Sequence, residues 1–325
     1  LVTAPGKDAG LFLTNLKVRG WLDYETLSKD RSDIIIVTLT GDRHGKPQVD
    51  YTVNPALGIP DITGHEGSAD PVANAIPAWD MIAGNMCVSS LLAAERYRLR
   101  HGVGQDVEIA LKDVAAAAIG HLGMIADSTL NSDDRTKAGN ALYGAYGKDF
   151  LCADGNRVMI IGLTSRQWSG IVKATNTAEQ FKKLEMENNI NLQDESVRWQ
   201  WRHEITEIIE PWFKIRAVKD FSDDFDKTGL TWSVFRSVKE ALNVDPDLTE
   251  DNPLFKKILQ PDAGEFLVPR HPANFSKVES SDAAPAPALG EHTEEILGDV
   301  LNLSDLEIAN LFDDGVVASS NYNKN

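Results

Sequence analysis

The first third of the chain alternates short apolar runs with amphipathic segments. Residues 11–16 have the pattern of a strand, and residues 33–41 are apolar and rich in β-branched side chains, as in a buried strand. Residues 23–31, between them, have the polar and apolar spacing of a helix. A strand, a helix and a strand in succession predict a parallel sheet with crossover helices.

A long helix is predicted over residues 81–100, which contain no proline. One of its faces carries small residues that would allow close approach of another backbone or a ligand: Gly84, Cys87, Ser90 and Ala94. Two glycines in "HGVGQ" end the helix, and the alternation in residues 106–113 predicts another strand. Residues 113–127 then predict a helix too apolar for a surface position.

The polar stretch at 131–140 introduces a second region. Residues 146–163 predict a β-hairpin with a turn at Asp154-Gly155, and charged helical segments follow. Residues 280–292 are a connector rich in proline and alanine. The tail predicts a pair of helices, with Ser304 and Glu307 as a capping box.

These patterns predict an α/β protein with four parts. They are a large domain with the parallel sheet at 1–115, a linker helix at 116–138, a small α+β domain at 139–262 and a C-terminal segment at 263–325.

Composition narrows the function classes. The chain has 325 residues, 42% hydrophobic and 25% charged, as in a globular protein. Its formal net charge is −17, whereas a nucleic-acid-binding protein needs a basic surface, so nucleic-acid binding is not expected. Its apolar runs are too short to cross a membrane, and no secretory signal is recognisable, so we expect a cytoplasmic protein.

The two cysteines, Cys87 and Cys152, lack the spacing of a metal or redox motif, and we expect buried free thiols. His203-Glu204 has no second histidine at helical spacing, so no metal site is predicted. "GVGQDV" lacks a third glycine and precedes a strand, which excludes a dinucleotide-binding fingerprint.

Asp80 is the acidic residue in the otherwise uncharged stretch "NAIPAWDMIAGNM". Aspartate is a favoured N-cap, and Asp80 lies where the long helix is predicted to begin. A carboxylate at a helix N-terminus, among small residues, can also act as a covalent nucleophile. Local sequence leaves both interpretations open.

Several strings, in order along the whole chain, resemble the class III CoA-transferase family: "VDYTVNP", "PAWD", "IALKDV", "IGHLGMIA" and "YGAYGKDF". The resemblance implies a Rossmann-like large domain, a small domain inserted into it, a C-terminal segment at 263–325 that returns to the large domain, and two chains that interlock as a homodimer. Compared with the family pattern, the chain lacks the first strand–helix units. No permanent cofactor is implied, because coenzyme A arrives as part of an acyl-CoA substrate.

The resemblance makes Asp80 the catalytic residue, which would attack the thioester to form an anhydride and then an aspartyl-CoA thioester. The members most similar to this chain imply intramolecular CoA transfer, converting 2-methylfumaryl-CoA (mesaconyl-C1-CoA) to 3-methylfumaryl-CoA (mesaconyl-C4-CoA). The alternatives are CoA transfer between two dicarboxylic acids, an α-methylacyl-CoA racemase of the same fold, or a catalytically silent acyl-CoA-binding protein.

Other site residues follow less directly. Asn15 and Leu16 match the family's CoA-contacting Asn-Phe pair, although leucine replaces phenylalanine. Tyr51 falls where other members place an active-site aromatic residue, but it could equally be a core residue. The remaining candidates for contact with CoA or the acyl group are Arg19, Arg98, His121 and Tyr143. The basic residues near Arg98 could instead form a solvated helix face.

Overall fold

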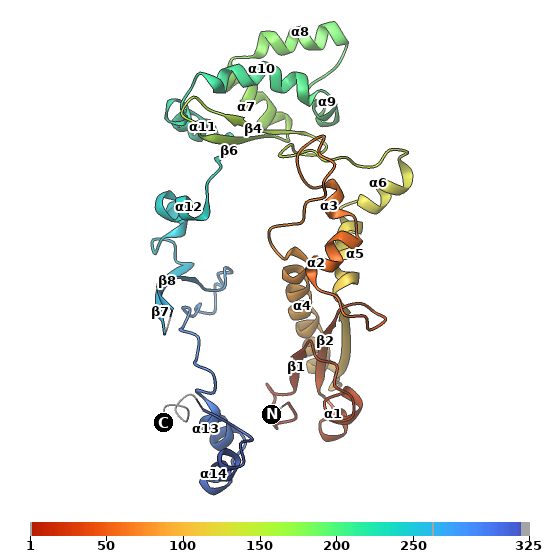
Figure 1. Cartoon of the computed structure of the whole chain (residues 1–325), viewed down its shortest axis with the longest axis vertical. Coiled ribbons are helices and arrows are strands. Elements are labelled where there is room, and N and C mark those ends of the chain that lie inside the picture. The colour runs from red at the N-terminus through yellow and green to blue at the C-terminus, as the bar shows by residue number, and fades with distance from the viewer. Residues whose placement is uncertain (1, 262, 320–325) are drawn as a thin grey trace. The chain divides into compact units, whose positions relative to one another are not determined.

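The computed structural model describes residues 2–261 and 263–319 (Figure 1). The chain divides into two compact units, residues 2–235 and the residues from Arg236 onward. The sequence placed a division at 262/263 instead, between the two strands of a hairpin.

The first unit begins with a three-stranded parallel sheet in the order β1-β2-β3. Its strands are β1 (Leu11–Thr14), β2 (Ile35–Thr40) and β3 (Gln105–Ala110). Helix α1 (Tyr24–Asp30) connects the first two strands, and the Asp23 side chain caps it by accepting a hydrogen bond from the Thr26 amide. The predicted strand–helix–strand order is confirmed, as is the α/β class.

Helices cover both faces of this sheet because β2 is apolar on both sides. Ile35 and Val37 pack towards α4, whereas Ile34 and Ile36 pack towards Leu27 of α1. All four strand side chains are at most 3% exposed. Such continuous burial is typical of a parallel sheet between two helical layers.

Five further helices belong to this part of the unit: α2 (Asp50–Ala56), α3 (Ile59–Ile62), α4 (Ala78–His101), α5 (Leu111–His121) and α6 (Met124–Leu130). Helix α4 starts three residues before the predicted bound. Its buried face contains Cys87 and Ala94 as expected, but Gly84 is exposed. The predicted linker helix at 116–138 is wrong, because a left-handed turn at Gly123 (φ 76°) separates α5 from α6. No residue of α6 is buried.

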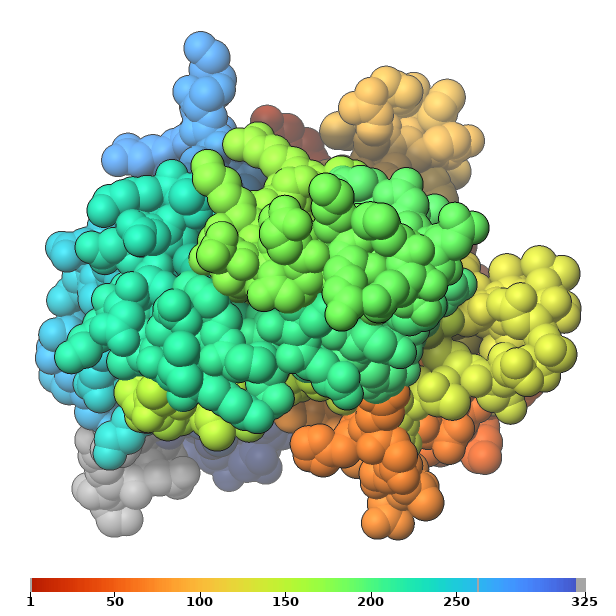
Figure 2. All heavy atoms as spheres, turned by 90° about the horizontal axis from the view of Figure 1, so that it is seen from above, coloured from red at the N-terminus to blue at the C-terminus, as the bar shows by residue number. Residues whose placement is uncertain are grey.

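The second layer of the first unit is an antiparallel sheet covered by helices. Its strands are β4 (Tyr146–Leu151), β5 (Arg157–Gly162) and β6 (Thr231–Val234), and the predicted hairpin is confirmed. The helices are α7 (Ser165–Thr175), α8 (Ala178–Asn188), α9 (Glu195–Gln200), α10 (Arg202–Lys214), η1 (Val218–Asp220) and α11 (Ser222–Thr228). Figure 2 shows their green surface from above. Fourteen buried residues, including Trp168 and Phe213, form the core of this layer.

The unit from Arg236 onward consists of short elements. They are α12 (Val238–Val244), η2 (Pro246–Leu248), β7 (Phe255–Gln260), β8 (Gly264–Pro269), α13 (Thr293–Glu295), the π-helical turn η3 (Ile296–Val300) and α14 (Asp305–Asp313). β7 and β8 pair as an antiparallel hairpin. The capping box is confirmed, since the Ser304 hydroxyl and the Glu307 carboxylate each accept a hydrogen bond from the other residue's backbone amide.

Gly104 is predicted to tolerate no side chain, because a Cβ there would lie 1.9 Å from the Ile34 carbonyl oxygen. Gly104→Ala should lower the free energy of unfolding by about 2–3 kcal/mol. A Cβ at Gly84 meets no atom within 4 Å, so Gly84→Ala in α4 should raise it by about 0.5–1 kcal/mol. Urea unfolding of both variants measures the two effects, and equal values would contradict the close approach at Gly104.

Candidate active site at the first turn of helix α4

The first turn of α4 lies at the carboxyl edge of the parallel sheet. Near the other end of α4, Arg98 contacts the carbonyls of Ala9, Gly10 and Asp33, which precede β1 and β2. The C-terminus of the helix is therefore at the amino ends of the strands, and its N-terminus is at the opposite edge. In open α/β sheets, ligands bind at the carboxyl ends of the strands.

Asp50, from α2, is the carboxylate that caps α4. Its Oδ2 accepts hydrogen bonds from the backbone amides of Trp79 at 2.7 Å and Asp80 at 3.3 Å. Asp50 is only 2% exposed, so two amides that lack partners within the helix gain a buried, charged acceptor. The sequence did not reveal this cap, because 29 residues separate Asp50 from Trp79.

Asp80 is therefore not the N-cap. Pro77 occupies that position and makes no side-chain cap, and Asp80 is the third residue of the helix. The expectation of a cap at Asp80 is wrong because proline fits the start of a helix and α2 provides the missing acceptor. The carboxylate of Asp80 is exposed and has no hydrogen-bond or ion-pair partner among the described residues.

The electrostatic environment of Asp80 makes its ionised form less favourable than in water. Burial contributes most and the charge of Asp50 adds to it, and together they raise the pKa of the Asp80 carboxyl above its ordinary value. A carboxylate with a raised pKa is a stronger base and a better nucleophile once it has lost its proton. The site can thus present the reactive carboxylate of Asp80 beside that of Asp50, which is hydrogen-bonded to backbone amides.

Asn15, Leu16 and Arg19 follow β1 at the carboxyl edge of the sheet, the same edge as the start of α4. All three side chains are exposed, and the Leu16 side chain is 61% exposed. The hydroxyl of Thr14 holds this turn by accepting a hydrogen bond from the Leu16 amide at 3.0 Å. The geometry leaves these three residues free for ligand contact.

Arg98 has a different position from the one expected of a CoA-binding residue. Its guanidinium is 5% exposed and donates to backbone carbonyls of the segment before β1. It lies 18 residues beyond Asp80, about 27 Å along the helix. The structure gives the Arg98 guanidinium a buried contact with backbone carbonyls at the edge of the sheet opposite the start of α4, and contact between Arg98 and coenzyme A stays a prediction.

Tyr51 follows Asp50 in the first turn of α2, and its ring is 58% exposed, so it is not a core residue. It directly follows Asp50, the residue that caps the first turn of α4, which carries Asp80. His121 is the exposed last residue of α5. Among the described residues, no hydrogen bond to the Tyr51 hydroxyl or to the His121 ring is found.

Tyr143 belongs to a stack of cationic and aromatic side chains. The Arg135 guanidinium lies 3.6 Å from its ring centroid, and the Trp199 ring lies 4.9 Å away on the small-domain side. The Arg202 guanidinium covers the Trp199 ring at 4.2 Å and pairs with Glu66 at 2.6 Å. This stack ties α9 and α10 to the segment after α6, which gives Tyr143 a structural role.

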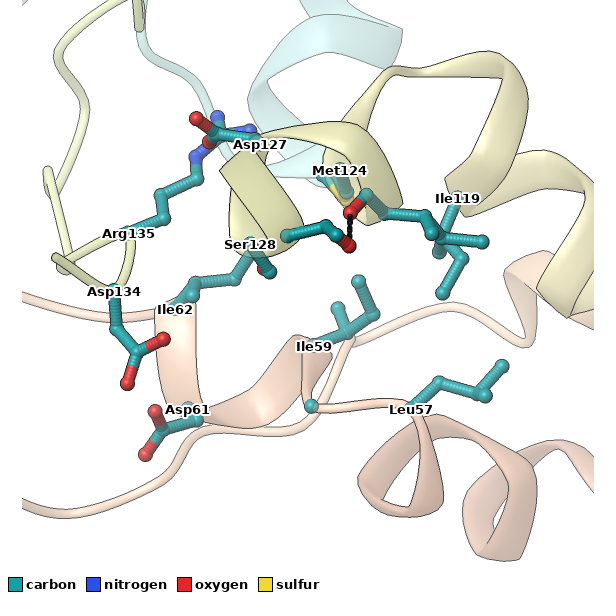
Figure 3. Close-up of a pocket in the computed structure, with 13 residues that line it drawn as sticks. Leu57, Ile59, Asp61, Ile62, Ile119, Met124, Asp127, Ser128, Asp134 and Arg135 are labelled. Atoms are coloured by element: carbon teal, nitrogen blue, oxygen red, sulfur yellow. Dashed lines mark hydrogen bonds between the residues drawn. The ribbon is translucent and has the colours of Figure 1, made fainter. Parts of the chain in front are cut away.

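A cavity of about 420 Å³ lies between the α2–α3 turn and α5–α6 (Figure 3). Its floor is apolar and consists of Leu57, Ile59, Ile62, Ile119, Met124 and Ile125. Asp61, Asp127, Asp134 and Arg135 lie at its rim. Neither Asp80 nor any other predicted site residue lines it, although the Asp127 carboxylate accepts a hydrogen bond from the Tyr143 hydroxyl at 3.3 Å.

Within residues 2–261 and 263–319, no three histidine, cysteine, aspartate or glutamate side chains are grouped to hold a metal ion. In the same part of the chain, none of the helices has the length and hydropathy needed to span a bilayer. Cys87 and Cys152 are free and buried, as predicted.

The chain belongs to CoA-transferase family III, whose model matches residues 8–293, and it is therefore an enzyme of that family. Over 318 residues it is 48% identical to the 2-methylfumaryl-CoA isomerase of Chloroflexus aurantiacus, covering 98% of this chain and 78% of that protein. It is 26% identical over 305 residues to the succinyl-CoA:glutarate CoA-transferase of Mus musculus. There it covers 91% of this chain and 66% of the relative, just under two thirds of its length.

Solved structures of the family share the fold. A CAIB/BAIF family protein from Brucella suis superposes with a TM-score of 0.69 at 21% identity, covering 90% of this chain and 76% of that one. Rv3272 from M. tuberculosis gives 0.69 at 19% identity, with coverages of 89% and 77%. These similarities establish the mixed α/β class III CoA-transferase fold.

Arg98→Ala is predicted to destabilise the protein by about 3 kcal/mol, because several buried carbonyls would lose their donor. Arg96→Ala, on the exposed side of the same helix, should change stability by less than about 0.5 kcal/mol. Urea denaturation compares the two variants. A folded Arg98→Ala protein of unchanged stability that fails to bind coenzyme A would support the CoA-binding assignment.

Asp80→Asn is predicted to stabilise the folded protein at neutral pH. The pKa of the Asp80 carboxyl is higher in the folded state than in the unfolded state. Above both pKa values the carboxyl is ionised in both states, and its charge then lowers the stability of the folded state. The gain in Tm should be about 1–2 °C, since the side chain is exposed and screened. It should vanish at a pH low enough to protonate Asp80 in both states. A lower Tm at neutral pH would show instead that the helix terminus stabilises the charge.

Proposed function

We propose that the protein catalyses intramolecular CoA transfer, converting 2-methylfumaryl-CoA to 3-methylfumaryl-CoA. The observation that carries the proposal is the 48% identity to a 2-methylfumaryl-CoA isomerase over 98% of the chain. The arrangement around Asp80 supports it, because an exposed carboxylate of raised pKa stands at a helix terminus at the carboxyl edge of the sheet.

In this mechanism Asp80 is the covalent nucleophile. Its carboxylate attacks the thioester carbonyl, the C–S bond breaks, and CoA thiolate leaves behind a mixed anhydride. The thiolate then attacks the Asp80 carbonyl of the anhydride, which forms an aspartyl-CoA thioester and releases the dicarboxylate.

The return steps are the same two reactions through the other carboxylate of the acid. That carboxylate attacks the aspartyl thioester and expels CoA thiolate, which then attacks the substrate carbonyl of the new anhydride. The product is the isomeric thioester, and Asp80 is regenerated as a carboxylate. Retaining the acid in the site makes its re-entry effectively unimolecular, and exclusion of water would protect both anhydrides from hydrolysis.

Asp50 would support Asp80 in two ways. By capping the backbone amides of Trp79 and Asp80, it holds the start of α4 in place without consuming the Asp80 carboxylate. Its charge also opposes the ionisation of Asp80 and favours the neutral, acylated states of the cycle, in which Asp80 carries no charge.

The Rossmann-like topology, the insertion of the small domain into the large one, the CoA-contacting roles of Asn15, Leu16 and Arg19, and an interlocked cytoplasmic homodimer remain parts of this proposal. Support for an assembly comes from α4, which exposes apolar side chains away from the sheet: Met81, Ile82, Val88 and Leu92. A group of exposed apolar side chains on one helix is typical of a surface that another protein chain covers.

The second candidate is CoA transfer between two different carboxylic acids. It is favoured by the 26% identity to a succinyl-CoA:glutarate CoA-transferase over 91% of the chain. Both reactions would use the same aspartyl intermediates, and they differ in whether the first acid leaves the site.

Purified protein is predicted to convert 2-methylfumaryl-CoA to 3-methylfumaryl-CoA with no added acid. Asp80→Asn should lower the rate by about 10³-fold or more, because the covalent route is lost. Hydroxylamine should trap a hydroxamate at Asp80 in the wild-type protein only. Chromatographic separation of the two thioesters and peptide mass spectrometry provide the measurements.

The matched control is Asp113→Asn. Asp113 is also the third residue of a helix, α5, and is also exposed. Its replacement should leave turnover unchanged. Turnover that appears only when a second carboxylic acid is added would replace the isomerase with the intermolecular transferase. Full activity of Asp80→Asn would reject both.

A further inference from the structure

Asn54 and Trp79 make a second contact between α2 and the first turn of α4. The indole Nε1–H of Trp79 donates to Asn54 Oδ1 at 3.0 Å. The two side chains are 5% and 1% exposed, respectively, for Trp79 and Asn54. Asp50 and Asn54 are four residues apart and lie on the same face of α2, so one helix face holds both the backbone of α4 and its indole.

We propose that Asn54 is a positioning residue for Asp80 and acts through the indole of Trp79. The inference rests on the proposed function of Asp80 as nucleophile. Successive side chains of an α-helix are separated by about 100° around its axis. A turn that holds Trp79 in the core must therefore direct Asp80 outward, as the exposure of the two side chains reflects.

Apolar packing alone would fix this direction less well. Trp79 packs in a cluster with Val53, Ala83 and Leu111, whose contacts have little directional preference. An indole N–H can only donate, and the bond to Asn54 selects one orientation of the ring. The amide Nδ2 of Asn74 also approaches Asn54 Oδ1, at 3.5 Å, so the segment leading into α4 reaches the same acceptor.

A purely structural role and a positioning role predict different outcomes in a double variant. Trp79→Phe leaves Asn54 Oδ1 with only the longer contact from Asn74, and Asn54→Leu leaves the buried indole N–H without an acceptor, so each should lose stability. With both substitutions the two groups are apolar and stability should largely return. The hydrogen bond between the Trp79 indole and Asn54, however, is absent in both single variants and in the double variant.

The experiment measures kcat, KM and the free energy of unfolding for wild type, both single variants and the double variant. We expect kcat for 2-methylfumaryl-CoA to fall about tenfold in all three variants, with KM changed by less than about twofold. Recovery of stability without recovery of kcat in the double variant supports positioning. Recovery of both together overturns it.

Trp232→Phe is the matched control. The Trp232 indole donates to Asp226 Oδ1 at 2.9 Å, a bond of similar length within the small-domain layer. Its removal should lower stability without lowering kcat. A tenfold lower kcat in this control would show that loss of stability alone reduces activity and would also overturn the proposal.

A substrate-free measurement separates this inference from the proposed function. A water-soluble carbodiimide with an amine labels protonated carboxyl groups, and the pH midpoint of labelling at Asp80 reports its pKa. If Asn54 and Trp79 hold Asp80 near Asp50, the midpoint should move to lower pH in all three variants. A wild-type protein without isomerase activity would refute the proposed function, and this midpoint would then decide the positioning role. An unchanged midpoint would overturn it.

Discussion

The candidate site depends on the hydrogen bonds that the Asp50 carboxylate accepts from the start of α4. A 24-residue helix carries four amides without partners at its N-terminus and a partial positive charge there. Because Asp50 satisfies two of them from a neighbouring helix, the first turn can begin at a proline and leave its own aspartate unbonded. A local cap by Asp80 would have consumed the group that the proposed chemistry needs.

The same arrangement brings two carboxylates, Asp50 and Asp80, close together, which is unfavourable while both are ionised. The ionised form of Asp80 is disfavoured there, since partial burial raises the pKa of its carboxyl most and the charge of Asp50 raises it further. The two carboxylates have different tasks because their environments differ. Asp50 is buried and bonded to backbone amides, whereas Asp80 is exposed and unbonded. Acylation of Asp80 would remove its negative charge and with it the electrostatic cost of ionised Asp80. That cost therefore favours the covalent states over the free enzyme.

Local patterns were enough for elements whose stabilising contacts are close in sequence. The strands at 11–16 and 33–41, the hairpin at 146–163 and the Ser304–Glu307 capping box were all predictable for that reason. Asp80 itself emerged from the resemblance to a family, not from its surroundings. The cap at Asp50 was not predictable, because its two partners are 29 and 30 residues away and nothing local distinguishes it. The buried contacts of Arg98 were not predictable for a similar reason, since a charged residue in a basic helix end gives no sign that distant carbonyls surround it.

Helix α4 is fixed at its two ends by opposite chemistry, and this explains how its direction is determined. At the carboxyl edge of the sheet, the anionic Asp50 of α2 accepts hydrogen bonds from amides in the first turn of α4. At the amino edge, the cationic Arg98 of α4 donates to carbonyls of the segment before β1. Reversing the helix would place each charge beside groups of the wrong polarity. The middle of the helix needs only small side chains, Ala83, Cys87 and Ala94, to approach the sheet closely. The direction of Asp80 is therefore set by α2, and the distance of α4 from the strands is set by the small side chains along its buried face.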